Sequence, residues 1–106
     1  MARTLKRLAG PVSISGAAAT RYTVPASTTA VIRHMHFDNT TAGALTITVS
    51  IGADAAATEL FTTFSIAANS VLDHFCLYVL TAAEILQAGA SGAITMTVDG
   101  EEITLG

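Results

Sequence analysis

Charged residues are scarce in this chain of 106 residues, which has only five Lys and Arg and eight Asp and Glu, or 12% of the sequence. A soluble domain usually carries about 25%. Hydrophobic residues make up 51%. Because a soluble monomer normally needs more surface charge to stay dispersed, this composition indicates either a membrane protein or a surface buried against other protein. Five basic residues are also too few for the footprint of a nucleic-acid interface, so we expect no nucleic-acid partner.

Long apolar runs are also missing. Thr, Ser, Asp and His interrupt every stretch before it reaches the roughly 18 consecutive apolar residues of a spanning helix. Near the start, Gly10, Pro11, Ser13 and Ser15 break what would otherwise be the apolar region of a signal peptide. We therefore expect no membrane partner and interpret the low charge as a sign of assembly into an oligomer or a larger particle.

The sequence has one Cys and no Trp. A single Cys allows neither an internal disulfide nor a thiolate metal cluster, and Cys76 stands in the apolar run 75–80, where it should pack as a small hydrophobe. The four Phe lie in apolar segments and are interpreted as core residues. Tyr22 is the one aromatic residue that we expect to be exposed, as the platform of a sugar-binding site would be.

Thr, Val and Ile dominate what is present, and turn residues recur at short spacing, which is typical of many short strands. In residues 45–51, Leu and the β-branched apolar residues alternate with Thr and Ser, so one face is predicted to be buried. Residues 93–99 repeat the alternation, with Ile94, Met96 and Val98 facing inward. No segment keeps the 3.6-residue period of a helix. The sequence predicts an all-β fold, an antiparallel two-layer β-sandwich that is jelly-roll-like, with about eight short strands.

Turn residues bound the expected strands. Residues 71–80 are predicted to be a long, central strand. Asp99 and Gly100 predict a hairpin turn, because Gly accepts the positive φ of tight hairpins. Residues 81–87 fit one helical turn or an irregular entry into a strand at 85–88, and we favour the strand. The expected strands are 20–24, 30–38, 45–51, 59–66, 71–80, 85–88, 93–99 and 101–105.

The first 19 residues differ in composition from the rest, because they are basic at first and then rich in Ser, Gly and Ala. We interpret residues 1–19 as an extended N-terminal arm and residues 20–106 as the sandwich domain. The cations at the start either solubilise the arm or dock it on an acidic neighbour, and both interpretations stay open. The candidate assembly contacts in the arm are Arg3, Leu5, Lys6, Leu8, Val12 and Ile14.

One group of residues has the composition of a metal site. His34 and His36 are two apart on a predicted strand and so share a face, and His74 would join them from residues 71–80. Three His would suffice for a catalytic zinc site. No general base or supporting partner is evident, so we favour polar residues on the outer face or at a subunit contact.

Motifs for catalysis are absent from the sequence. It has neither a Gly-x-Ser-x-Gly elbow nor a phosphate-binding loop. Glu101 and Glu102 are adjacent and face opposite sides of a strand, so they cannot pair as glycosidase carboxylates. We predict a protein that is not an enzyme, with no cofactor and no metal.

Three segments, Tyr22–Ala26, Thr29–Arg33 and Asn39–Thr41, resemble a group of small virion proteins of tailed bacteriophages. Their pattern is a tyrosine-threonine-x-proline-alanine motif, a threonine-alanine-x-isoleucine strand and an asparagine-threonine turn. The chain is also similar at Val98–Ile103, which matches a Val-x-Gly-x-Glu end. It departs at Ala83, where glycine is usual. The likeness covers about residues 20–103, and its motifs are structural.

The resemblance implies a β-sandwich component of the particle. The expected function is a virion structural protein, an oligomeric capsid decoration (cement) protein located in the virion after assembly in the host cytoplasm. Its partners would be copies of itself, as in a trimer, and the major capsid or tail proteins. The alternative is a minor tail, neck or collar protein, with or without binding of host-surface glycans. A zinc enzyme built on the three His residues is the remaining hypothesis.

Overall fold

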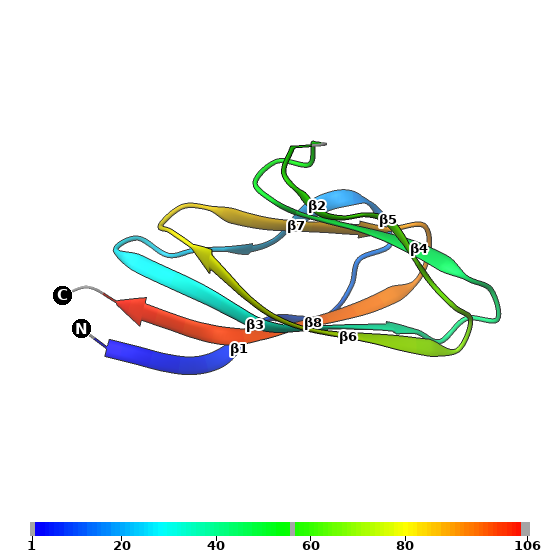
Figure 1. The fold of residues 1–106 in the computed structure, drawn as a ribbon, viewed down its shortest axis with the longest axis horizontal. Coiled ribbons are helices and arrows are strands. Elements are labelled where there is room, and N and C mark those ends of the chain that lie inside the picture. Colours follow the sequence, from blue (N-terminus) through cyan, green and yellow to red (C-terminus); the bar gives the residue numbers. More distant parts are fainter. Residues whose placement is uncertain (1, 56, 105–106) are drawn as a thin grey trace.

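The computed structural model describes residues 2–55 and 57–104, and these form strands and connecting turns without a helix. Two four-stranded antiparallel sheets, β1-β8-β3-β6 and β2-β7-β4-β5, pack face to face (Figure 1). The strands are β1 (Ala2–Ser13), β2 (Gly16–Thr23), β3 (Thr28–Asn39), β4 (Leu45–Ile51), β5 (Glu59–Ile66), β6 (Ser70–Leu80), β7 (Ile85–Ala90) and β8 (Ile94–Thr104).

The strand pairing follows a single rule. β1 pairs with β8, β2 with β7, β3 with β6 and β4 with β5, so the described chain forms one long antiparallel hairpin that is rolled up. Because this long hairpin is rolled up, β3 also pairs with β8 and β4 also pairs with β7, and these pairs complete the two four-stranded sheets. This is the strand order of a jelly roll. The predicted all-β, two-layer, jelly-roll-like fold is confirmed.

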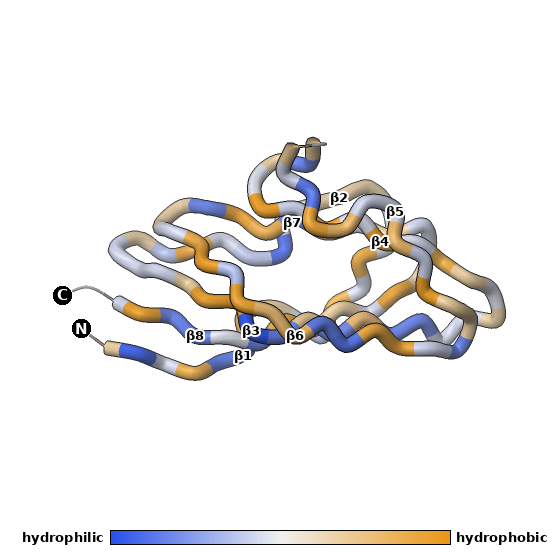
Figure 2. Tube along the Cα trace, in the orientation of Figure 1, coloured by the Kyte–Doolittle hydropathy of each residue, from blue (hydrophilic) through white to orange (hydrophobic). Residues whose placement is uncertain are grey.

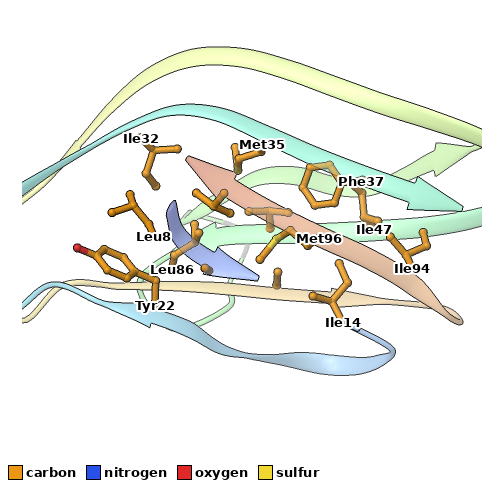
Figure 3. Close-up of a cluster of buried hydrophobic side chains, with 14 of the residues drawn as sticks. Leu8, Ile14, Tyr22, Ile32, Met35, Phe37, Ile47, Leu86, Ile94 and Met96 are labelled. Atoms are coloured by element: carbon orange, nitrogen blue, oxygen red, sulfur yellow. The ribbon is translucent and has the colours of Figure 1, made fainter. Parts of the chain in front are cut away.

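The core lies between the sheets, where apolar side chains of both layers meet (Figure 3). Ile47 and Val49 of β4 and Ile94, Met96 and Val98 of β8 are fully buried, as the alternation predicts. Burying each such side chain contributes about 1.5–3 kcal/mol.

The Phe residues divide between core and surface. Phe37 is fully buried in the core, and Phe61 is half-buried against it. The prediction of a core position is wrong for Phe64 and Phe75, whose side chains are exposed. Phe75 lies on the outer face of the edge strand β6, which the other sheet does not cover, and Phe64 lies in the edge strand β5.

The N-terminal segment differs from the expected arm. Ala2–Ser13 is strand β1, paired along its length with β8, and the expected boundary at residue 20 falls inside β2. Ile14 is fully buried and Leu8 nearly so, because they fill the core beneath β8. Residues 2–19 are therefore part of the sandwich in this structure.

The predicted hairpin at Asp99-Gly100 is wrong, because β8 runs unbroken through both residues. Gly100 lies opposite Ile32, where the register between β3 and β8 shifts. A Cβ on Gly100 would overlap the carbonyl oxygen of Val31. Glycine at this position thus permits a close approach of two backbones and not a turn.

Two other strands test the sequence expectations. β6 is an edge strand and not a central one, since β3 is its sole partner among the described strands. β7 begins at Ile85 after a turn in which Ala83 has a positive φ of 70°. The favoured interpretation of residues 81–87, an entry into a strand, is confirmed.

Candidate functional site

Strand β6 carries a row of exposed apolar side chains, which we call the β6 stripe: Val71, Phe75, Leu77 and Val79. Their exposed fractions are 54%, 77%, 63% and 58%. Successive side chains of a strand alternate between faces, so these four lie on the outer face of the β1-β8-β3-β6 sheet. In Figure 2, much of the length of β6 has the colour of hydrophobic residues.

The opposite face of β6 is apolar as well. Leu72, Cys76 and Tyr78 pack against the core. A strand that is apolar on both faces is typical of a buried position, which is why the sequence suggested a central strand. The structure covers only one face and leaves one edge of β6 without a partner among residues 2–55 and 57–104. A long, apolar edge strand is a surface for pairing with another chain.

Strand β1 occupies the other edge of the same sheet, and two of its three cations, Arg3 and Lys6, are paired within the chain. Arg3 Nε lies 3.2 Å from Glu101 Oε1, and Lys6 Nζ lies 3.2 Å from Glu102 Oε1. Arg33 of β3 approaches Glu101 Oε2 to 2.6 Å. The acidic neighbour of Arg3 and Lys6 in this structure is therefore strand β8 of the same chain.

The six predicted assembly contacts have different surroundings. Leu8 and Ile14 belong to the core cluster, and Val12 packs against it half-buried. Arg3, Leu5 and Lys6 remain at the surface, with Leu5 75% exposed. Only these last three are placed where a neighbouring subunit would meet them.

The expectation that Tyr22 is exposed is wrong. Its ring is buried in the core (Figure 3), and its hydroxyl donates a hydrogen bond to Glu102 Oε2. Burial and the adjacent carboxylate raise the pKa of Tyr22. The same hydrogen bond, followed by one from Lys6, lowers the pKa of Glu102. Tyr22 therefore provides no aromatic platform for a sugar.

A cluster of titratable side chains lies on the outer face beside the β6 stripe. Asp73 Oδ1 is 2.9 Å from His34 Nε2 and 2.6 Å from His36 Nδ1. These hydrogen bonds, that of His36 above all, lower the pKa of Asp73. Asp99 Oδ2 is 3.6 Å from His34 Nδ1, and the ring of Phe75 stacks on His34 with centroids 4.5 Å apart.

His74 does not join this cluster. It lies on the inward-facing side of β6, where its Nε2 is 3.1 Å from the Tyr78 hydroxyl and its ring meets the edge of Phe61. The hypothesis of a site made by His34, His36 and His74 is therefore wrong in its third member. Asp73 takes that place, because it lies directly opposite His36 in the pairing of β3 with β6. Because side chains alternate along β6, Asp73 and His74 lie on opposite faces of the sheet. Only the register between β3 and β6 shows that Asp73 lies beside His36.

Cys76 is half-buried, with its sulfur 3.6 Å from the carbonyl oxygen of Ile32. Burial raises the pKa of its thiol, and a thiol is a poor nucleophile and metal ligand. These observations agree with the packing role expected for Cys76.

A hollow of about 280 Å³ lies on the β2-β7-β4-β5 sheet. Small and hydroxyl-bearing residues line it, and Asp54 is the one ionisable residue among those described around it. It thus presents none of the acid–base pairs or nucleophile–base pairs on which catalytic sites depend. The lining consists of Gly16, Ala17, Ala18, Thr46, Thr48, Asp54, Gly89, Ala90 and Ser91.

Comparisons of the chain with protein-family models, with curated proteins and with solved structures give no match. The described residues contain no helix long and apolar enough to cross a membrane. The functional argument therefore starts from the outer face of the β1-β8-β3-β6 sheet.

Proposed function

We propose that this chain is a non-enzymatic structural subunit that assembles with copies of itself, and that it serves as a virion protein of a tailed bacteriophage, of the capsid decoration type. The observation that carries the assembly is the β6 stripe on an unprotected sheet edge. The resemblance at Tyr22–Ala26 and Val98–Ile103 supports the phage assignment. Jelly rolls are common in viral capsid proteins, but they also occur in lectins and cupins, so the fold alone does not choose among these functions.

The size of the stripe indicates what kind of contact it makes. Four side chains of this type, each already about one-third covered, gain roughly 4–8 kcal/mol on full burial. Association costs about 4–15 kcal/mol in lost rigid-body freedom. One stripe alone therefore gives marginal binding. Each copy needs further contacts, which edge-to-edge pairing of β6 or a closed ring of subunits supplies.

We infer a trimer as the closed assembly, with the major capsid protein as its docking partner. In a ring, each copy covers the stripe of the next, so no apolar edge is left to propagate into a fibre. The low content of charged residues, 12% of the sequence, suits a protein whose surface is packed against other subunits.

The oligomeric state tests the first part of this proposal. Light scattering during size-exclusion chromatography should give about three times the 10.8 kDa mass of one chain. Phe75→Ser combined with Leu77→Ser should reduce the mass to that of one chain, because the two substitutions remove the two most exposed apolar side chains of the stripe. Leu5→Ser changes a side chain that is as exposed as Phe75 but lies on the β1 edge, so it tests whether that predicted assembly contact belongs to the same interface. A monomeric wild type, or a double variant that keeps its mass, would overturn the assembly proposal.

Particle labelling tests the second part. Antibodies against the chain should decorate the heads of virions from a phage that encodes it. Label confined to the neck or the tail would favour the alternative assignment as a minor tail, neck or collar protein. Virions that carry no label at all would contradict both.

A further inference from the structure

The His34, His36 and Asp73 cluster has the composition and spacing of a metal site. One nitrogen from each ring and one carboxylate oxygen all lie within 4.8 Å of one another. The two His come from β3, and Asp73 comes from β6 in the position opposite His36. Three donors on two paired strands are held by the sheet hydrogen bonds and not by a loop, which favours a fixed geometry.

The distances within the cluster are close to those that an ion would require. Donors of a tetrahedral zinc ion lie about 2.0–2.2 Å from the metal and so roughly 3.3 Å from one another. The two His–Asp separations are 2.9 Å and 2.6 Å. Opening each of them by less than about one ångström, with the two ring nitrogens, which lie within 4.8 Å, brought to a similar separation, admits the ion. An ion would replace the protons that now lie between the rings and the carboxylate.

A second observation concerns the far side of His34. Its Nδ1 faces Asp99 Oδ2 at 3.6 Å, while its Nε2 faces Asp73. A carboxylate behind a ligating imidazole fixes the tautomer and the ring orientation. Phe75 stacks on the same ring and restricts its rotation. Asp99 comes from β8, so neighbouring strands supply both the ligands and their support.

We propose that His34, His36 and Asp73 bind a divalent transition-metal ion, with zinc as the ion that suits two imidazoles and one carboxylate. Asp99 is the positioning residue for His34. All three ligands are partly exposed, so an ion reaches the site from solvent and keeps an open coordination position. The site lies beside the β6 stripe, and its existence does not depend on the proposed assembly.

Calorimetric titration of the untagged, chelator-treated full chain with zinc chloride tests the site. We expect one zinc ion per chain. Asp73→Asn and His36→Gln should abolish the binding, since each removes one of three ligands. Asp99→Asn should keep the stoichiometry but weaken the affinity about 10–100-fold. His74→Gln is the matched control and should bind as the wild type does, because His74 lies on the other face of β6.

Acidification provides an independent measurement. Because imidazole and carboxylate bind metal in their deprotonated forms, zinc should be released as the pH falls, while circular dichroism shows the strands intact. Three outcomes would overturn the proposal: less than one zinc per chain in the wild type, unchanged binding by Asp73→Asn, or loss of binding by His74→Gln.

Discussion

The two edges of the β1-β8-β3-β6 sheet are built in opposite ways. β1 carries Arg3 and Lys6, its register against β8 shifts twice between Arg7 and Val12, and Pro11 offers no backbone N–H to a neighbour. Charges, bulges and proline are the devices by which natural sheets block edge-to-edge pairing. β6 has no proline, but it carries one charge on its outward face, Asp73, and one register shift against β3 between Phe75 and Tyr78, and its stripe is apolar.

The comparison shows where a partner can add to the sandwich. On β1, Arg3 and Lys6 form ion pairs with Glu101 and Glu102 of β8 in the same chain. On β6, Asp73 is paired with His34 and His36, but the four apolar side chains of the stripe stay exposed. We therefore expect changes in β1 to affect folding and changes on the outer face of β6 to affect association.

Deletion of residues 2–15 should have the largest effect. It removes β1 and the buried side chains of Leu8 and Ile14, and it leaves one side of β8 unpaired. We expect an unfolded or aggregated chain, seen as loss of the strand signal in circular dichroism. A folded, soluble truncated protein would instead show that these residues are a dispensable arm.

Single substitutions also test whether side chains near the N-terminus belong to the core, with a smaller expected effect. Ile14→Ala should lower the free energy of unfolding by about 2–5 kcal/mol, the usual cost of a large-to-small change in a core. Leu5→Ala, on the exposed side of β1, should change it by no more than about 0.5 kcal/mol. Urea unfolding measures both values. Equal effects would contradict the placement of Ile14 in the core and of Leu5 at the surface.

The smallest expected effect is the pH dependence contributed by Glu102. Its pKa is lowered from 4.5 in the folded chain, so its stabilising effect is complete above that value and is lost as the pH falls through the folded pKa. Glu102→Gln should therefore flatten the fall of stability in acid. Tyr22→Phe should flatten it partly, because Tyr22 provides the largest of the hydrogen bonds that lower this pKa. Unfolding curves at neutral and acidic pH measure the difference, and an unchanged slope in Glu102→Gln would count against this role.

Much of the fold could be predicted because it depends on local patterns. The alternation in residues 45–51 and 93–99 places Ile47, Val49 and Met96 inward with no knowledge of their partners. Turn residues then bound residues 45–51 and 59–66 as the structure has them. These features suffice for an all-β sandwich of the jelly-roll type.

What failed depends on contacts between distant segments. Asp99-Gly100 matches the local sequence of a hairpin. Glycine is needed at position 100, however, because the backbone of Val31, far away in the sequence, comes too close for a side chain. Similarly, the composition of β6 does not distinguish a central strand that is buried on both faces from an edge strand that exposes one apolar face. Asp73 joins His34 and His36 only through the register between β3 and β6. Neither spacing nor composition encodes that register.

The rolled hairpin also determines the order in which the sandwich can be completed. β4 and β5 are close in sequence and can pair early, whereas β1 and β8 bring together residues 82 to 102 positions apart, from Ser13 with Thr95 to Ala2 with Thr104. Such distant pairings form slowly, because the chain entropy of closing a long loop is lost before the contacts form. β8 is the last of these strands to leave the ribosome, yet it lies between β1 and β3. A nascent chain therefore carries β6 while its sheet is still incomplete, and its apolar stripe is exposed during this interval, when association with other chains competes with folding.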